Sequence, residues 1–325
     1  MPRKIKRVDT KRSKGAGRQP SAPVKQGFFS GISTDAIAIM MVVGVAVIAV
    51  SIFFLSSWVS RHQSAPKPTV TLGQVHSLAA TGAGSKTWLT ATRNGLYRST
   101  DAGKTWQPTN VSGQEVTSVL SDPSRPDTLY ITGNNILDKS VDGGQTWQKM
   151  SAQLPSLDIS TAALDPSSPG RLYLFLVSNG LYRSPDLGAT WEQVSTTLPS
   201  TTSTLAIDPL DPNTIYTGSS GGGVKLSTDG GKAWSDASKG ILSLAVSSIV
   251  AAKGPPAYLI AVSDGNVYKS TDGAKTWALS DSGLVQAPIS AVAISPSTGA
   301  ILAVGDSGAV YVSSDSGGKW SASQG

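Results

Sequence analysis

The sequence contains no cysteine, and it has only two histidines and two glutamates among its 325 residues. The absence of cysteine excludes disulfide bonds, thiolate metal ligands and lipid-modified cysteine anchors. So few histidines and glutamates leave little material for acid–base chemistry or for a metal site. We therefore expect no metal ion and no cofactor.

Positive charge is also scarce outside one short segment. Lysine plus arginine total 27 and aspartate plus glutamate total 21, a formal net charge of +6. Residues 1–34 hold nine basic residues and one acid (+8), so residues 35–325 hold 18 basic and 20 acidic residues (−2). A nucleic-acid-binding fold needs a basic face with aromatic stacking platforms, and only the tail is basic. We expect no nucleic-acid partner.

One long hydrophobic run follows the basic tail. It reads AIAIMMVVGVAVIAVSIFFLSSWV from Ala36, and no charge lies between Asp35 and Arg61. At about 1.5 Å per residue, a helix of this length spans the ~30 Å hydrocarbon core, and Trp58 suits an interfacial anchor. A cleaved signal peptide is the alternative, but its apolar region is about 7–15 residues and needs a better cleavage site. We predict a transmembrane signal anchor over residues 35–59, in contact with membrane lipid.

The charge asymmetry around this helix predicts its orientation. The basic tail, residues 1–34, is expected to be disordered and cytoplasmic, because cytoplasmic flanks carry the excess of lysine and arginine. Residues 60–74 form a linker in which Ala-Pro-Lys-Pro favours extended chain. The remaining domain, residues 75–325, is then extracytoplasmic, in a periplasm, at the cell surface or in a lumen.

A nine-residue phrase occurs six times in that domain. It reads RSTDAGKTW at residues 98–106, and its serines recur at spacings of 41, 44, 43, 43 and 43 residues. A fixed period of this size signals a solenoid, propeller or array. Residues 116–150 contain four short β-branched and aromatic runs between turn residues, and no helical period. We predict an all-β, six-bladed β-propeller of four-stranded antiparallel blades, preceded by the one transmembrane helix. The last blade closes on the first without an exchanged strand, although residues 69–72 (TVTL) are a possible extra edge strand.

The repeated phrase is predicted to be structural. Its aspartate can accept backbone N–H bonds from two residues on, and its serine can tie the two sides of a hairpin. The glycine suits a positive φ, and Ala274, which replaces it once, is expected to strain its turn. The tryptophan is expected to lie in the core between sheets. The six copies are Ser99, Asp101, Gly103 and Trp106; Ser140, Asp142, Gly144 and Trp147; Ser184, Asp186, Gly188 and Trp191; Ser227, Asp229, Gly231 and Trp234; Ser270, Asp272 and Trp277; and Ser313, Asp315, Gly317 and Trp320.

The pattern S-x-D-x-G-x-T-W resembles the Asp-box, also called the BNR repeat. Asp-Pro phrases between the first and second runs (DPSRPDTLY at Asp122, DPSSPGRLY at Asp165, DPLDPNTIY at Asp208) add to the likeness. The combination is similar to sortilin-type and photosystem II assembly factor-type propellers. This resemblance implies Asp-boxes at the blade periphery, away from any active site.

Sialidases share the Asp-box, so a cell-surface glycoside hydrolase of sialidase-like type is the alternative function. That resemblance implies an arginine triad, a Tyr/Glu nucleophile pair and an aspartic acid catalyst. The propeller has five arginines, and Arg98 and Arg183 share one register of the repeat. Of the two glutamates, Glu192 follows a motif tryptophan, so we predict no catalytic residues. The strings AGKT and VDGGQ lack the residues that a phosphate loop or a calcium loop requires.

Binding residues are expected around the central channel and on the loops opposite the Asp-boxes. The second residues of the first strands line the channel in a propeller, and they are His76, Thr117, Ser160, Ser203, Ser247 and Ser290. His76 is a candidate ligand group, and the alternative is a solvated histidine without partners. The loops between second and third strands are polar and glycine-rich, as binding loops on a rigid scaffold tend to be. The candidate face therefore comprises His76, Arg93, Asn134, Asn179, Asp264 and Asp306. The predicted function is a non-catalytic binding or assembly scaffold for a protein or glycan partner.

Overall fold

The computed structural model describes residues 71–81, 86–150, 153–168, 170–254, 257–284, 288–295 and 298–323. The predicted cytoplasmic tail and transmembrane helix lie outside these residues. Within them, no helix is long and apolar enough to cross a membrane.

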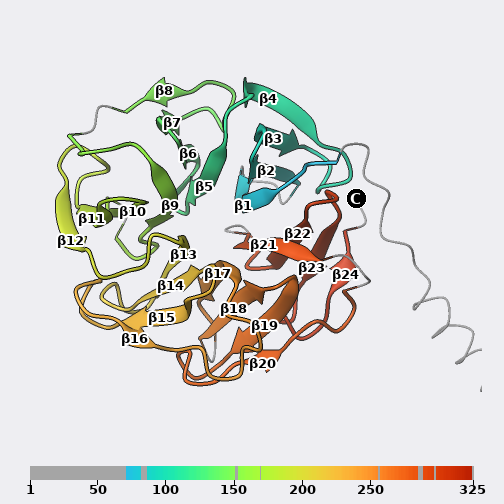
Figure 1. Cartoon of the computed structure of the whole chain (residues 1–325). Coiled ribbons are helices and arrows are strands. Elements are labelled where there is room, and N and C mark those ends of the chain that lie inside the picture. Colours follow the sequence, from blue (N-terminus) through green and yellow to red (C-terminus); the bar gives the residue numbers. More distant parts are fainter. Residues whose placement is uncertain are drawn as a thin grey trace, which may run out of the picture. The chain divides into compact units, whose positions relative to one another are not determined.

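The described residues form six four-stranded antiparallel sheets arranged in a ring, which confirms the predicted six-bladed propeller (Figure 1). The first strand of each sheet lies innermost, and the fourth lies at the periphery (Figure 1). Blade one holds β1 (Val75–Thr81), β2 (Thr87–Thr92), β3 (Gly95–Ser99) and β4 (Gln107–Ser112). Blade two holds β5 (Val116–Asp122), β6 (Arg125–Gly133), β7 (Ile136–Ser140) and β8 (Gln148–Lys149). Blade three holds β9 (Ile159–Leu164), β10 (Leu172–Leu176), β11 (Gly180–Ser184) and β12 (Glu192–Ser195). Blade four holds β13 (Thr202–Ile207), β14 (Ile215–Ser219), β15 (Gly223–Ser227) and β16 (Ser235–Asp236). Blade five holds β17 (Val246–Ala252), β18 (Tyr258–Ser263), β19 (Asn266–Ser270) and β20 (Ala278–Leu279). Blade six holds β21 (Ile289–Ile294), β22 (Ile301–Gly305), β23 (Val310–Ser313) and β24 (Ser321–Ala322).

The core lies between neighbouring blades, where the second strands are covered on both faces. All five residues of β10, LYLFL, are buried, as expected for a strand packed on both sides. The peripheral strands are short, and those of blades two, four, five and six have only two residues. Short edge strands limit pairing with other chains, so the outer rim is protected against aggregation.

Blade six packs directly against blade one, and each blade consists of four consecutive strands, as predicted. Asp306 Oδ1 accepts a hydrogen bond from Val75 N at 2.9 Å, and Ser323 Oγ donates to Ala102 O at 2.6 Å. Leu72 is fully buried in the same interface, and residues 71–74 form no strand. The described part of the TVTL segment therefore adds a side chain to the core and no edge strand.

Each repeated phrase forms a compact hydrogen-bonded turn between the third and fourth strands. In the second copy, Ser140 Oγ donates to Asp142 Oδ1 at 2.7 Å and accepts from Gly144 N at 2.8 Å. Asp142 Oδ1 accepts from Thr146 N at 2.9 Å, so the carboxylate reaches four residues on, where two were expected. The Thr146 hydroxyl and N–H and the Ser140 hydroxyl hold the pKa of Asp142 well below its usual value. The pKa of every box aspartate is lowered.

Two successive residues of each box turn have positive φ. The glycine position has φ between 83° and 95° in five copies, and Ala274 keeps the geometry with φ 64°. The preceding position also has positive φ, and it is not glycine in three copies, namely Ala102, Leu187 and Ser316. A left-handed conformation costs a non-glycine residue roughly 1–2 kcal/mol, so the serine and aspartate bonds must hold these turns.

The box tryptophans are not equally buried, contrary to expectation. Trp106, Trp277 and Trp320 are 0%, 5% and 2% exposed, and each indole N–H donates to a backbone carbonyl of a neighbouring blade. Trp147, Trp191 and Trp234 are only half-buried. The structural role of the position is therefore stronger in blades one, five and six.

Candidate binding site at the channel mouth

The second residues of the inner strands join the blades, in addition to lining the channel. Their hydroxyl groups donate to backbone carbonyls of the next blade: Thr117 to Ile159 at 2.8 Å, Ser160 to Thr202 at 2.6 Å, Ser203 to Val246 at 2.8 Å and Ser247 to Ser290 at 2.9 Å. Hydroxyl groups at this register therefore join four of the six blade boundaries around one end of the channel, and we call this set of residues the hydroxyl ring. The small polar residues at this register therefore hold neighbouring blades together. Most of their hydroxyl protons are already donated to other groups of the protein and are not available to a ligand.

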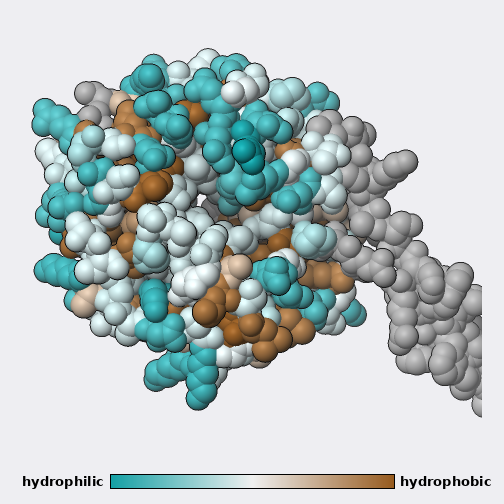
Figure 2. Space-filling model, viewed as in Figure 1, coloured by the Kyte–Doolittle hydropathy of each residue, from teal (hydrophilic) through white to brown (hydrophobic). Residues whose placement is uncertain are grey.

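A cavity of about 680 Å³ opens at this end of the channel. Four carboxylates from four different blades line it, and no lysine or arginine does so among the described residues. Figure 2 shows one face of the propeller, hollowed at its centre and bordered there mainly by residues of intermediate or polar hydropathy. We call this cavity the mouth. Its four carboxylates are Glu115, Asp158, Asp264 and Asp306, and His76 also lines it.

His76 has a partner, contrary to the alternative of a lone solvated histidine. Its Nε2 atom lies 2.9 Å from Glu115 Oε1 of the next blade. The imidazole occupies the register that carries a hydroxyl in the other five blades. At this one blade boundary, an imidazole–carboxylate contact therefore takes the place of the inter-blade hydroxyl bond.

Two of the mouth carboxylates are built into turns. Asp306 Oδ1 accepts from the Ser290 hydroxyl at 2.7 Å as well as from Val75 N, so it is fixed at the closure of the ring. Asp264 has φ 49° in the β18–β19 turn, and its backbone N–H donates to Ala245 O at 3.1 Å. Aspartate and asparagine tolerate this conformation better than other non-glycine residues.

The structure brings four of the six candidate residues together at the mouth. These are His76, Asn134, Asp264 and Asp306, whereas Arg93 and Asn179 do not line the cavity. Arg93 is exposed and Asn179 is half-buried, with its backbone carbonyl accepting from Gln193 Nε2 at 2.7 Å.

Sequence reasoning missed Glu115 and Asp158 as mouth residues. Each directly precedes the first strand of its blade, and all six residues at that register line the mouth. The register itself was the available signal, because one more residue added to each inner strand gives this ring. The six residues are Gln74, Glu115, Asp158, Thr201, Ala245 and Pro288.

The five arginines of the propeller lie outside the mouth. Arg125 pairs with Asp122 at 2.8 Å, Arg171 with Asp165 at 3.0 Å, and Arg183 with Glu192. Arg93 and Arg98 do not line the mouth either. The described residues therefore place no arginine cluster in the mouth that could bind a substrate carboxylate. No group of three or more potential metal ligands occurs in the same part of the chain.

Comparisons with known proteins agree with this architecture. A family model of the DUF6242 beta propeller domain matches residues 210–325, and a BNR/Asp-box repeat model matches residues 97–108. No match is found among curated proteins. The resemblance to Asp-box repeat propellers is therefore confirmed.

Solved structures share the fold at low sequence identity. An ancestral GH74 enzyme gives a TM-score of 0.55 at 14% identity over 79% of this chain, which spans 41% of that enzyme's length. The GH74 xyloglucanase from Xanthomonas campestris gives 0.54 at 19% identity, covering 80% of this chain and 46% of the enzyme. YCF48 bound to a D1 peptide gives 0.51 at 18% identity, covering 80% of this chain and 84% of YCF48. The predicted likeness to photosystem II assembly factor-type propellers holds at the level of the fold.

Proposed function

We propose that this chain is a membrane-anchored, non-catalytic β-propeller that binds a protein partner at the mouth, outside the cytoplasm. The observation that carries the proposal is the convergence of four carboxylates in a cavity of about 680 Å³ without a lysine or arginine among its described lining residues. Glu115 contacts His76 and Asp306 is held by Ser290, which leaves Asp158 and Asp264 as the available acceptors.

A polypeptide segment with a basic side chain fits this mouth. Its ammonium or guanidinium group would meet the carboxylates, which accept charge-assisted hydrogen bonds. Negative charge without local compensation also raises the association rate of a cationic partner. The YCF48 structure with a D1 peptide supports a peptide as a partner for a propeller of this kind. A neutral glycan carries no positive charge and gains less from the carboxylates, and an acidic glycan would be repelled by them.

The proposed location rests on the sequence. The apolar run from Ala36 is long enough to span a bilayer, and the nine basic residues before it favour a cytoplasmic N-terminus. The propeller would then meet its partner in an extracytoplasmic compartment.

Glycoside hydrolysis is the second candidate function. The shared fold with GH74 enzymes and the carboxylates of the mouth favour it, because two carboxylates suffice for many glycosidases. The sialidase-like form is disfavoured, since Arg125, Arg171 and Arg183 are paired with carboxylates elsewhere.

Site-specific crosslinking of the full chain in its own membrane tests the proposal. A photoreactive amino acid replaces Ala245, which is exposed and lines the mouth. We expect a discrete protein adduct that is lost when Asp158→Asn and Asp264→Asn are combined. The matched variant Asp127→Asn, an exposed carboxylate outside the mouth, should keep the adduct.

Three results would contradict the proposal. An adduct unaffected by the paired mouth substitutions would place the partner elsewhere, and a photoreactive group at Leu279 on β20 that captures the same protein equally would show non-specific contact. Release of sugar from a glycan by the wild-type chain, abolished by the same two substitutions, would replace binding with hydrolysis.

A further inference from the structure

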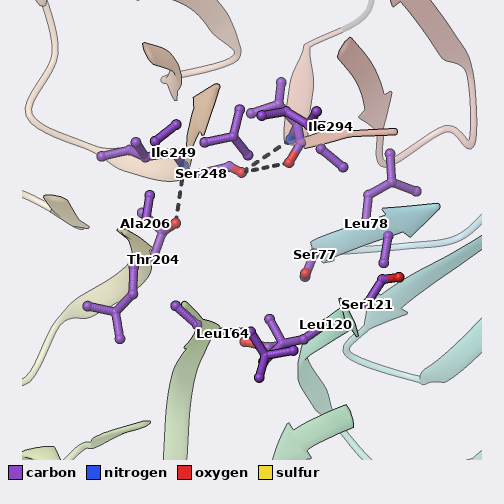
Figure 3. Close-up of a pocket in the computed structure, with 18 of the residues that line it drawn as sticks. Ser77, Leu78, Leu120, Ser121, Leu164, Thr204, Ala206, Ser248, Ile249 and Ile294 are labelled. Carbon is purple, nitrogen blue, oxygen red and sulfur yellow. Dashed lines mark hydrogen bonds between the residues drawn. The ribbon is translucent and has the colours of Figure 1, made fainter. Parts of the chain in front are cut away.

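The channel beyond the hydroxyl ring has a different character from the mouth. A second cavity of about 450 Å³ begins there, and both cavities share His76, Thr117 and Ser203. Aliphatic side chains from five inner strands line it, and Figure 3 shows three of them, Leu120, Leu164 and Ile294, around one open space. One larger aliphatic residue near the far end of the inner strand of each of blades two to six belongs to this lining, namely Leu120, Leu164, Ile207, Val250 and Ile294.

Four of these five side chains are only half-buried, and Ile207 alone is fully buried. Binding an apolar ligand against apolar surface that faces the channel is favourable, because the surface is removed from water. A cavity of this size lies in the range of small-molecule sites, roughly 300–1,000 Å³. The lining therefore suits an elongated apolar ligand.

Hydroxyl groups of this lining bond to neighbouring blades, whereas the Ser121 hydroxyl has no hydrogen-bond partner among the described residues. The Thr204 hydroxyl accepts from Ile249 N at 3.1 Å, and the Ser248 hydroxyl accepts from Val292 N at 3.2 Å (Figure 3). Each inner strand is the edge strand of its sheet, so its backbone pairs with another strand on one side only. A hydrocarbon chain has no N–H or C=O groups to pair, so a mostly aliphatic lining suits it without the hydrogen bonds that a peptide needs.

One charge marks the far end of this cavity. Lys253 is exposed and follows β17, at the register where three other blades carry the proline of their Asp-Pro turns. No aspartate or glutamate lines the cavity among the described residues. The turn carboxylates Asp122 and Asp165 pair with Arg125 and Arg171, whereas Asp208, in the blade beside that of Lys253, has no basic partner among the described residues. Lys253 is the one lysine or arginine among the described residues that line the apolar channel.

We propose that this channel binds the hydrocarbon chain of an amphiphile whose single anionic head group, a carboxylate or a phosphate, pairs with Lys253. The chain lies against the aliphatic ring, and the head group stays at the solvent-exposed end. This site adjoins the mouth, with which it shares three lining residues, and the proposal does not depend on the protein partner proposed above.

Photolabelling of the full chain in phosphatidylcholine nanodiscs tests the proposal. The probe is a long-chain fatty acid with a diazirine in mid-chain, and labelled positions are mapped by peptide mass spectrometry. We expect labels on the peptides that contain Leu164 or Ile294, displaced by the unlabelled fatty acid. Within a chain-length series, each added methylene should strengthen competition by about threefold to fourfold relative to the free aqueous competitor concentration, until the channel is filled.

Lysine substitutions test the pairing between Lys253 and the head group. Lys253→Ala should weaken labelling by the fatty acid about twofold to fivefold, as expected for an exposed ion pair, and Lys232→Ala, an exposed lysine outside the channel, should not. A long-chain alcohol with the same diazirine should label less and respond to neither variant. Lys253 is exposed, so its loss is not expected to disturb folding, and a circular dichroism melt verifies this.

The labelling pattern identifies the head group, and it also shows whether the proposal is wrong. Stronger channel labelling by a photoreactive phosphatidic acid than by the fatty acid would assign the phosphate form, and the reverse would assign the carboxylate form. Labels confined to residues 36–59 or to the blade periphery would overturn the proposal, because they report partition into the bilayer or non-specific contact. Equal labelling by acid and alcohol would overturn the role of Lys253.

Discussion

Replacing Trp106 with alanine is expected to cost more stability than replacing Trp147, although both occupy the same position of the repeat. Trp106 is fully buried, and its Nε1 atom donates to Gly308 O at 3.2 Å across 202 residues of sequence. Trp147 is half-buried, and its Nε1 atom has no hydrogen-bond partner among the described residues. The first substitution therefore opens the closure between blades one and six, and the second trims a partly exposed contact.

The two costs differ in magnitude. Truncating a buried tryptophan removes about 3–5 kcal/mol, and the unpaired Gly308 carbonyl adds about 1 kcal/mol. A half-buried indole keeps roughly 100 Å² out of water, which at ~25 cal/mol per Å² gives about 1–3 kcal/mol for Trp147→Ala. Trp106→Phe serves as a control that retains the burial and loses the N–H bond, at about 1 kcal/mol.

Urea unfolding of the full chain in detergent, followed by circular dichroism, measures these differences. The expected order of destabilisation is Trp106→Ala, then Trp147→Ala, then Trp106→Phe. Equal costs for Trp106→Ala and Trp147→Ala would refute the conclusion that burial at this position differs between blades.

Three further predictions follow from the turns and the anchor. Gly103→Ala should cost about 2–5 kcal/mol in the same urea assay, because φ is 83° and the added Cβ would lie 2.5 Å from Val310 Cγ2. Gly113→Ala, with φ 75° and open space around it, should cost only about 1–2 kcal/mol, and equal costs would contradict the packing argument. Hydrogen bonds from Thr276 lower the pKa of Asp272 from 3.8 to about 2, so its contribution to stability is complete above about pH 4 and lost toward pH 2. Thermal melts should therefore fall over that window, and Asp272→Asn should flatten part of the fall; a melting temperature constant from pH 5 to pH 2 would oppose this. Protease added to intact cells should degrade the propeller and spare the tail, and a protected propeller would refute the proposed orientation.

The blade count and strand order could be predicted because the repeat encodes them several times over. Six copies of one phrase at nearly constant spacing fix the period, and the four short runs within residues 116–150 fix four strands per unit. The ring closure followed from the same pattern, since each unit begins with an inner strand and ends with an outer one.

The backbone conformation of the Asp-box turns and the burial of their tryptophans could not be predicted from the sequence. Ala102, Leu187 and Ser316 adopt positive φ without being glycine, so their identity gives no signal of it. The unequal burial of the tryptophans depends on contacts with the neighbouring blade, such as that between Trp106 and Gly308, and a repeat pattern contains no information on its neighbours.

The mouth was predicted in part for a similar reason. His76 and Asp264 were found because their registers were considered, whereas Glu115 and Asp158 lie one residue before the predicted strands. The contact between His76 and Glu115 joins two blades, so the sequence shows its two members but not their proximity.

A paired measurement on Asp142→Ala and Asp264→Asn separates architecture from binding most directly. Each variant of the full chain is melted, and its capture of the partner is measured by crosslinking from position 245. We expect a lower melting temperature for Asp142→Ala, because the turn loses its hydrogen bonds to Ser140 and Thr146. Asp264→Asn should melt like the wild type and capture less partner. If Asp142→Ala melts like the wild type and loses the partner, the Asp-box is the binding site and the account is wrong.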